Sequence, residues 1–268
     1  MSDDAEDSLT LSAGALAALT EFYAERDAQT EKLEKLKAGV EADDGNDERE
    51  EGGEKQGDVN GSAPANLSIH TFTEDWNESQ FWYSDETADL LAQQLLDGTS
   101  DDSVVAVVST PSVFVALRKI TAAEGYTGPK PKTFLLEHDY RFAVFPEFVF
   151  YDFAQPFQLP AHLKGAVDRI IVDPPFLSDD CQTKMAMTIR WLARTNNTST
   201  TVEGSKSNPR VLICTGERME KLVNRLYKPL GVSTTTFEPV HSGLKNEFRC
   251  YANFECEAWR WEEKKTGP

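Results

Sequence analysis

Short apolar runs alternate with amphipathic segments along most of the chain. Apolar side chains recur at helical spacing over 84–97 and over "VFVALRKI" (113–120), which predicts two helices. Residues 233–240 and 246–255 alternate apolar and polar positions, the pattern of an antiparallel pair. Five runs rich in β-branched and aromatic residues predict buried strands: 103–109, 133–139, 147–153, 168–173 and 210–216. Together these elements predict a parallel α/β sheet with an antiparallel edge.

The N-terminal part of the chain has a different pattern. Residues 9–39 place apolar side chains at helical spacing and then become highly charged, which predicts one amphipathic helix. Residues 41–63 are acidic and almost free of large apolar side chains, so we expect a disordered linker. The predicted organisation is an N-terminal helix, an acidic linker, a folded domain and a tail, over residues 1–40, 41–66, 67–260 and 261–268.

The net charge of −18 is concentrated near the N-terminus, where residues 1–62 carry 18 acidic and 6 basic side chains. The remaining sequence has no stripe of lysine and arginine, which disfavours a protein that binds nucleic acid through its phosphates. A basic protein partner matches this charge better.

Targeting and metal-binding patterns are missing from the sequence. The first residues are acidic, and no run has the 18 or so apolar residues of a membrane span, so we expect an intracellular protein without membrane contact. The cysteines have no metal-ligand spacing and the histidines are scattered, so we expect reduced thiols and no metal.

The segment "DRIIVDPPFLSDD" (168–180) predicts a strand, a rigid loop and a helix. Two consecutive prolines lack amide donors, so the strand must end at Asp173. Ser178 followed by two aspartates is typical of an N-cap with acids in the first helical turn, and the helix should reach about Leu192. Ligands bind at the carboxyl ends of strands in open α/β sheets, which places Asp173 to Phe176 beside a site.

Seven segments carry a resemblance to a known family: "QFWYSDET", "STPSV", "LEHDYRF", "FVFYDF", "DPPF", "LICTG" and "NEFRCYANF". In this order they resemble the S-adenosylmethionine-dependent lysine methyltransferases that act on translation elongation factor 1-alpha, a family once labelled N6-adenine DNA methyltransferases. The resemblance spans about residues 8 to 256, without the acidic linker and the insertion 194–208. "DPPF" alone is shared by many amine methyltransferases, whereas its combination with "QFWYS" and "NEFRCY" is specific.

The resemblance implies a Rossmann-like class I methyltransferase fold, with seven mostly parallel strands, an antiparallel C-terminal hairpin and helices on both faces. It implies S-adenosyl-L-methionine as methyl donor, S-adenosyl-L-homocysteine as product, and no metal. The implied substrate is a lysine of translation elongation factor 1-alpha, methylated by a cytoplasmic monomer that makes no stable complex with nucleic acid. The N-terminal helix would help to dock this substrate.

The chemistry expected at the "DPPF" loop is the positioning of an amine. A lysine ammonium, with a reference pKa of about 10.4, must lose a proton before its lone pair can attack a methyl group. The Asp173 carboxylate and the Pro174 carbonyl can accept the remaining amine hydrogens, and Pro174 and Pro175 hold both acceptors in place. Phe176 offers a ring face to the cation, worth about 0.5–2 kcal/mol. The alternative is a tight strand-to-helix turn with a capped acid.

The expected cofactor site begins at the loop after the first strand. Ser109, Thr110, Pro111 and Ser112 stand where most enzymes of this fold carry a glycine-rich loop, so hydroxyls and backbone groups would contact the methionine part. Asp173 is also expected to border the cofactor.

Acids at the ends of the next strands complete this site. Glu137 or Asp139 would bind the ribose hydroxyls, because two acceptor oxygens match a vicinal diol, and we prefer Asp139. Asp152 would face the adenine amino group, with Phe153 packed nearby. For each acid the alternative is a solvated strand end.

Aromatic residues are expected to surround the transferred methyl group. Trp82, Tyr83 and Ser84 would line the channel for cofactor or lysine, whereas Phe81 can also be a hydrophobic staple for the following helix. The residues expected to bind substrate are Phe81, Phe176, Asn246 and Phe248.

Two other functions remain open from the sequence. An N6-adenine nucleic-acid methyltransferase would use the same Asp-Pro-Pro-aromatic loop on a flipped base. A non-catalytic S-adenosylmethionine-binding module is suggested by the missing glycine loop and opposed by the intact "DPPF" loop.

Overall fold

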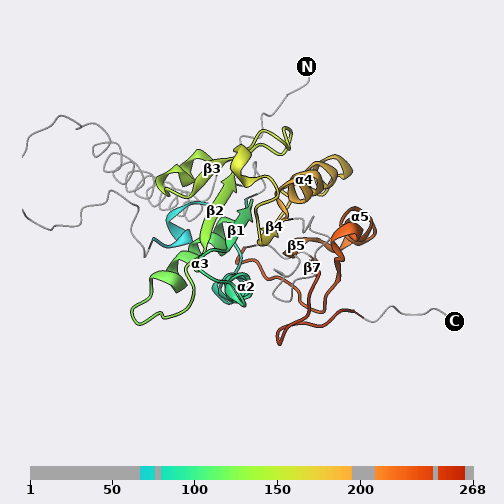
Figure 1. Cartoon of the computed structure of the whole chain (residues 1–268). Coiled ribbons are helices and arrows are strands. Elements are labelled where there is room, and N and C mark those ends of the chain that lie inside the picture. Colours follow the sequence, from blue (N-terminus) through green and yellow to red (C-terminus); the bar gives the residue numbers. More distant parts are fainter. Residues whose placement is uncertain (1–66, 76–79, 195–208, 244–246, 263–268) are drawn as a thin grey trace, which may run out of the picture. The chain divides into compact units, whose positions relative to one another are not determined.

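A computed structural model describes residues 67–75, 80–194, 209–243 and 247–262 (Figure 1). The strands in this part of the chain are β1 (Val104–Val108), β2 (Lys132–Glu137), β3 (Phe148–Phe150), β4 (Arg169–Val172), β5 (Arg210–Gly216), β6 (Ser233–Thr234) and β7 (Phe248–Ala252). They form one sheet with the order β3-β2-β1-β4-β5-β7-β6. β7 is antiparallel to both of its neighbours, and the other pairs are parallel. The predicted seven-stranded sheet with an antiparallel C-terminal pair is confirmed.

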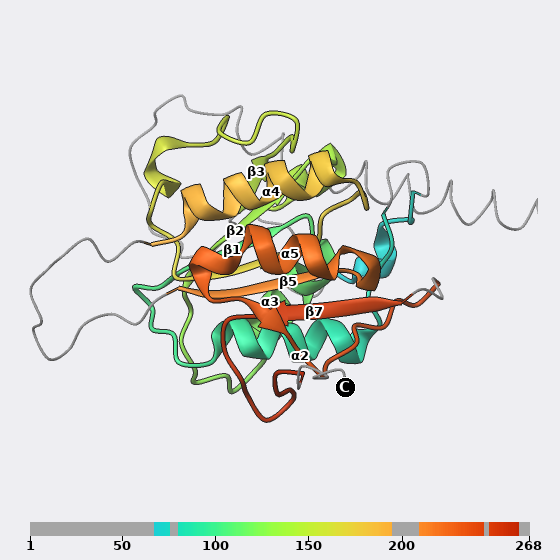
Figure 2. The same ribbon diagram turned by 90° about the vertical axis from the view of Figure 1, so that its right-hand side faces the viewer.

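Helices cover both faces of this sheet. The α-helices are α2 (Asp85–Leu96), α3 (Pro111–Ala122), α4 (Asp179–Leu192) and α5 (Glu220–Leu226). Short 3-10 helices are η1 (Ile69–Thr71), η2 (Tyr140–Val144), η3 (Ala161–Leu163), η4 (Glu217–Met219) and η5 (Lys228–Leu230). In Figure 2, α4 and α5 lie on one face of the sheet, and α2 and α3 lie on the other.

Local capping explains where two of the helices begin. The hydroxyl of Ser84 accepts the N–H of Thr87 at the start of α2. The hydroxyl of Ser178 accepts the N–H of Cys181 at the start of α4, as predicted. Acidic residues in the first turn of each helix interact favourably with the positive end of the helix dipole.

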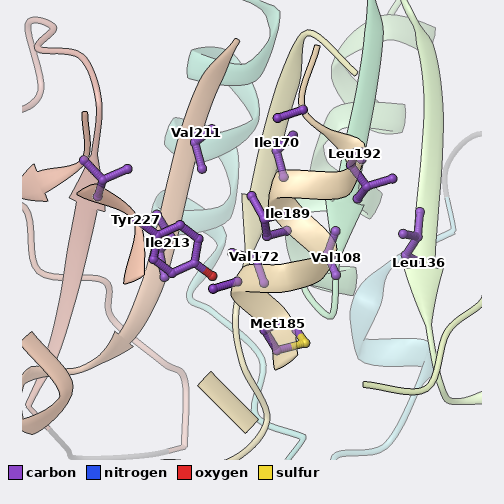
Figure 3. Close-up of a cluster of buried hydrophobic side chains, with 14 of the residues drawn as sticks. Val108, Leu136, Ile170, Val172, Met185, Ile189, Leu192, Val211, Ile213 and Tyr227 are labelled. Atoms are coloured by element: carbon purple, nitrogen blue, oxygen red, sulfur yellow. The ribbon is translucent and has the colours of Figure 1, made fainter. Parts of the chain in front are cut away.

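The core lies where α4 and α5 pack on the central strands. Figure 3 shows side chains of α4 directed at those of β4 and β5. All residues of β4 are buried, as expected for a strand covered on both faces. The labelled side chains of this cluster are Val108, Leu136, Ile170, Val172, Met185, Ile189, Leu192, Val211, Ile213 and Tyr227. Each buried aliphatic side chain contributes about 1.5–3 kcal/mol, so this cluster fixes the strand ends relative to one another.

Two strands are shorter than their sequence pattern predicts. The third strand ends at Phe150 because Asp152 turns the chain, its carboxylate accepting the N–H of Ala154 at 2.8 Å. β6 ends at Thr234 and does not extend to residue 240. The N–H of Phe237 donates to Thr235 Oγ1 at 3.3 Å, although Cys250 N of β7 still donates to Phe237 O at 3.2 Å. Side-chain hydrogen bonds turn the chain at both places and interrupt the regular strand ladder.

The chain leaves β6 to pair with a distant segment. Tyr83 and His241 form an antiparallel bridge, and Ser84 N donates to Val240 O at 2.8 Å. At the C-terminal side, Trp261 still bridges to Thr235, just beyond the expected domain boundary at 260. The aromatic segment before α2 is therefore held by the loop between β6 and β7.

The predicted N-terminal helix, acidic linker and Asn/Thr-rich insertion lie outside the residues that the structure describes. Within 67–75, 80–194, 209–243 and 247–262, no helix has the length and apolarity needed to cross a membrane.

Candidate functional site

A cavity of about 630 Å³ opens where β1, β2, β3 and β4 end. Parallel strands place the residues that follow them at one edge of the sheet, which is where ligands bind in open α/β folds. The segment before α2 forms another part of the wall. The predicted site residues in the lining are Phe81, Trp82, Tyr83, Ser109, Thr110, Pro111, Glu137, Asp139, Asp152, Phe153, Asp173, Pro174, Pro175, Phe176 and Phe248.

Asp173 stands directly after β4, where its N–H donates to Val108 O at 3.2 Å. Its Oδ2 accepts the phenol of Tyr83 at 2.6 Å, while Oδ1 accepts no hydrogen bond from the described residues. Burial raises the pKa of Asp173 to about 7; the Tyr83 hydrogen bond opposes this rise, and the charge of Glu137 adds to it. The carboxyl group thus has one fixed oxygen and one available oxygen.

The two prolines lead to Phe176, whose side chain is 40% exposed at the rim of the cavity. Its ring meets the edge of Phe153 at a centroid distance of 5.7 Å. The side-chain amide of Gln182 donates to Phe176 O at 3.3 Å, which ties the loop to α4. The loop is therefore fixed at both ends and leaves one aromatic face accessible.

Gly216, at the end of β5, makes room for this loop. A Cβ atom at Gly216 would lie 2.9 Å from a methyl carbon of Leu177, closer than side chains tolerate. The absence of a side chain at Gly216 therefore leaves room for Leu177, which directly follows the "DPPF" loop.

Tyr83 is only 2% exposed and is held from several sides. Its N–H donates to Ser112 Oγ at 3.2 Å, and its ring lies 4.5 Å from the ring of His241. Burial, followed by the nearby Asp173 charge, raises the pKa of Tyr83 well above its usual value. The phenol therefore stays protonated and donates to Asp173.

Two acids at the end of β2 have different partners. Glu137 Oε1 accepts the N–H groups of His138 and Asp139 at 2.8 and 3.2 Å, and its Oε2 accepts none from the described residues. Burial raises the pKa of Glu137 to about 7, although these backbone N–H groups oppose the rise. Asp139 instead accepts Arg141 Nε at 2.7 Å and Gln80 Nε2 at 3.0 Å. Burial would raise the pKa of Asp139, but Arg141 and Gln80 together lower it.

The loop after β1 has an unusual backbone. Ser109 has a φ of 52°, a left-handed conformation that glycine adopts more easily than serine. Thr110 precedes α3, and Pro111 occupies its first turn, where no amide donor is needed. The chain thus makes the tight turn of a glycine loop with a serine, and it brings the N-terminus of α3 to the cavity.

Comparison with known proteins gives consistent matches over most of the chain. Residues 74–256 match a family described as "Probable N6-adenine methyltransferase". The chain is 42% identical over 256 residues to "Protein-lysine N-methyltransferase EFM5" of Saccharomyces cerevisiae, covering 94% of each protein. It is 36% identical to "EEF1A lysine methyltransferase 1" of Homo sapiens, covering 94% of this chain and 96% of that protein.

The chain belongs to the elongation factor 1-alpha lysine methyltransferase family. A Gallus gallus protein with the same name, "EEF1A lysine methyltransferase 1", is 35% identical over 95% of this chain and 98% of its own length. A solved structure of a predicted O-methyltransferase from Agrobacterium tumefaciens superposes on 62% of this chain and 78% of its own with a TM-score of 0.40 and 12% identity. The fold assignment therefore rests on the strand order observed in this chain.

Most residues that the family resemblance singled out line one cavity, with two exceptions. Ser84 lies outside the lining, because its hydroxyl caps α2. The expected role of Ser84 beside the cofactor or lysine channel stays a prediction. Asn246 lies outside the described residues, whereas Phe248 lines the cavity with its ring 4.5 Å from His241.

Several lining residues were not predicted from the sequence: Asp75, Gln80, His138, Arg141, Tyr151, Leu177, Arg218 and His241. Gln80 and Arg141 occur inside the quoted segments "QFWYSDET" and "LEHDYRF", so their place in the motifs was an available signal. His241 follows a strand pattern that the structure interrupts, and only the pairing with Tyr83 brings it to the site.

Proposed function

We propose that this protein transfers a methyl group from S-adenosyl-L-methionine to the side-chain amine of a lysine in translation elongation factor 1-alpha. The observation that carries the proposal is the Asp173–Phe176 loop, which presents an available carboxylate oxygen and an exposed ring to one cavity. The names of relatives with 35–42% identity support both a lysine as the methylated group and elongation factor 1-alpha as the substrate.

The residues of the cavity fit the proposed methyl donor. When bound, S-adenosyl-L-methionine supplies an electrophilic methyl group on a sulfonium. Glu137 is the better ribose ligand, because Oε2 is available, whereas both oxygens of Asp139 accept hydrogen bonds from neighbours. This choice reverses the preference for Asp139 drawn from the sequence. Thr110 and the N-terminus of α3 would hold the methionine part.

In this proposal, the adenine of S-adenosyl-L-methionine lies at the end of β3. Asp152 lines the cavity while its Oδ1 accepts the N–H of Ala154, which fixes the orientation of the carboxylate. Phe153 lies beside it, with Lys184 Nζ 6.0 Å from its ring centroid. A carboxylate next to a ring suits an exocyclic amino group on a flat base.

The substrate amine must shed one proton and then hold its lone pair in line with the methyl group. Asp173 Oδ1 can accept one amine hydrogen and Pro174 O another, while Tyr83 keeps Oδ2 in place. Because its pKa is about 7, the Asp173 carboxyl can also hold a proton at neutral pH. The loop thus fixes the amine between two acceptors.

Positive charge on the substrate nitrogen meets an aromatic wall. Phe176 is exposed at the rim, and Tyr83 and Trp82 line the interior, where they are 2% and 4% exposed. A cation over an aromatic face gains about 0.5–2 kcal/mol, with the larger values at desolvated sites. These rings also keep water away from the reacting nitrogen.

N6-adenine methylation is the second candidate, because the matching family is described by that activity. The same acceptors would suit an exocyclic amine of a flipped base. The sequence after residue 62 has no basic stripe for a phosphate backbone, which favours lysine as the methylated group.

We further propose that the enzyme works in the cytosol, because its proposed substrate is a translation factor. We also propose that it works as a monomer.

Transfer of labelled methyl from S-adenosyl-L-methionine to separate substrates tests the proposal. Purified elongation factor 1-alpha, double-stranded DNA and RNA would each be incubated with the full chain. We expect label on the elongation factor and on neither nucleic acid. Label on DNA or RNA alone would replace the lysine activity with the adenine activity, and label on none would reject both.

A further inference from the structure

A second cavity, of about 480 Å³, adjoins the first. It lies between the loop after β6 and the start of β7, and it shares His241 and Phe248 with the cavity that holds Asp173. The charged residues in its lining, among those that the structure describes, are Glu217, Glu238, Glu247 and Arg249. Because two side chains belong to both linings, the two cavities form neighbouring parts of one surface.

The described residues that line the second cavity carry an excess of negative charge. Arg249 forms ion pairs with Glu217 at 3.2 Å and with Glu238 and Glu262 at 2.9 Å each. Glu247 is exposed and has no ion pair with any described residue. One arginine therefore faces more carboxylates than it can neutralise, which leaves a surface that attracts cations.

His241 lies between the two cavities, and its ring nitrogens have no hydrogen-bond partner among the described residues. The side chain is 7% exposed, and its ring packs 4.5 Å from the rings of Tyr83 and Phe248. Neither ring nitrogen is hydrogen-bonded to a described residue, although both cavities include this side chain in their walls. Burial lowers the pKa of His241 to about 4, so the ring is neutral and does not repel a cation.

We propose that the second cavity binds a basic side chain of the protein substrate beside the target lysine, and that His241 hydrogen-bonds the substrate main chain between them. This inference rests on the proposed lysine methyltransferase function. Glu247 and Glu238 supply the charge complementarity, and the shared wall makes the subsite continuous with the amine site. The acidic groove therefore selects lysines that have a basic neighbour.

Steady-state kinetics with elongation factor 1-alpha test the groove. We expect the double variant Glu238→Gln/Glu247→Gln to raise KM for this substrate about tenfold at low ionic strength, with kcat and the affinity for S-adenosyl-L-methionine within about twofold. Added salt should reduce the difference from wild type. Glu124→Gln is the matched control: Glu124 is exposed after α3, at the far end of that helix, and its variant should behave as wild type.

A second variant tests His241. His241→Phe keeps a ring between Tyr83 and Phe248 and removes both nitrogens, so we expect about a tenfold fall in kcat/KM with an unchanged melting temperature. Unchanged KM in the double variant and unchanged kcat/KM in His241→Phe would overturn the subsite. If wild-type enzyme leaves elongation factor 1-alpha unlabelled, the proposed function has failed instead, so the two failures are distinct.

Discussion

The ends of β4 and β2 both carry acids, but the protein surrounds these acids differently. Among the described residues, Asp173 accepts one phenol hydrogen bond and pairs with no cation, and burial raises its pKa to about 7. Asp139 accepts hydrogen bonds from the side chains of Arg141 and Gln80, and these bonds lower its pKa despite burial. A carboxylate already neutralised by arginine serves the fold, whereas one without a cation is available to a ligand.

The largest expected effect distinguishes these two acids directly. Asp173→Asn should reduce methyl transfer about 1000-fold or more, because the amine loses its anionic acceptor. Asp139→Asn should retain turnover within about tenfold and lower stability by about 1–3 kcal/mol, since Arg141 loses its charged partner. Labelled methyl transfer measures the turnover of both variants, and urea unfolding measures their stability. Equal losses of turnover would contradict the different roles of Asp173 and Asp139.

Tyr83→Phe should have the next largest effect. The variant keeps the ring but loses the hydrogen bond to Asp173, so kcat/KM should fall about 30-fold. The hydrogen bond lowers the pKa of Asp173, so its removal raises this pKa and should move the acidic limb of the pH–rate profile to higher pH. A lower rate with an unmoved limb would assign Tyr83 a packing role only.

Glu137→Gln tests which of the two acids at the end of β2 binds the cofactor ribose. An available carboxylate at Glu137 implies that this variant weakens S-adenosyl-L-methionine binding about tenfold, by the loss of one charge-assisted hydrogen bond. Asp139→Asn should weaken binding less. Calorimetric titration of both variants with S-adenosyl-L-methionine measures the two affinities. A larger loss of affinity in Asp139→Asn than in Glu137→Gln would restore Asp139 as the ribose ligand.

The pH dependence of stability should also reflect the two kinds of acid. Asp173 and Glu137 have raised folded-state pKa values of about 7, so folding favours their protonated forms. Their contribution to stability is present below the unfolded pKa of about 4 and is lost as pH rises towards 7. Unfolding at pH 5 and pH 8 should therefore show Asp173→Asn gaining stability relative to wild type at the higher pH. If the difference in unfolding free energy between the variant and wild type is the same at both pH values, the raised pKa of Asp173 is contradicted.

The smallest effect is expected at the end of β1. Ser109→Gly relieves a left-handed backbone but adds freedom to the unfolded chain, so stability should rise by about 0.5–1 kcal/mol. Thermal unfolding measures the change, and a loss of stability would mean that the serine hydroxyl supports the loop.

The sheet was predictable because buried parallel strands produce distinct runs of β-branched residues. β1 and β4 appear in the sequence as "VVAVV" and "RIIV", and their position at the sheet centre follows from burial on both faces. Helix starts were also predictable where a serine stands before acids, as at Ser178. Local chemistry dictates these features.

Long-range partners were not predictable. The pairing of Tyr83 with His241 joins segments far apart in the sequence, and nothing near either residue specifies it. The choice between Glu137 and Asp139 likewise depends on where Arg141 and Gln80 point. Sequence patterns identified the acids, whereas tertiary contacts distinguish their roles.

The most direct test of the account is the dissociation constant of S-adenosyl-L-methionine for Asp173→Asn. If Asp173 acts on the substrate amine, this constant should stay within about threefold of wild type, although transfer is lost. A rise of about 100-fold would contradict the account, because Asp173 would then be chiefly a cofactor ligand.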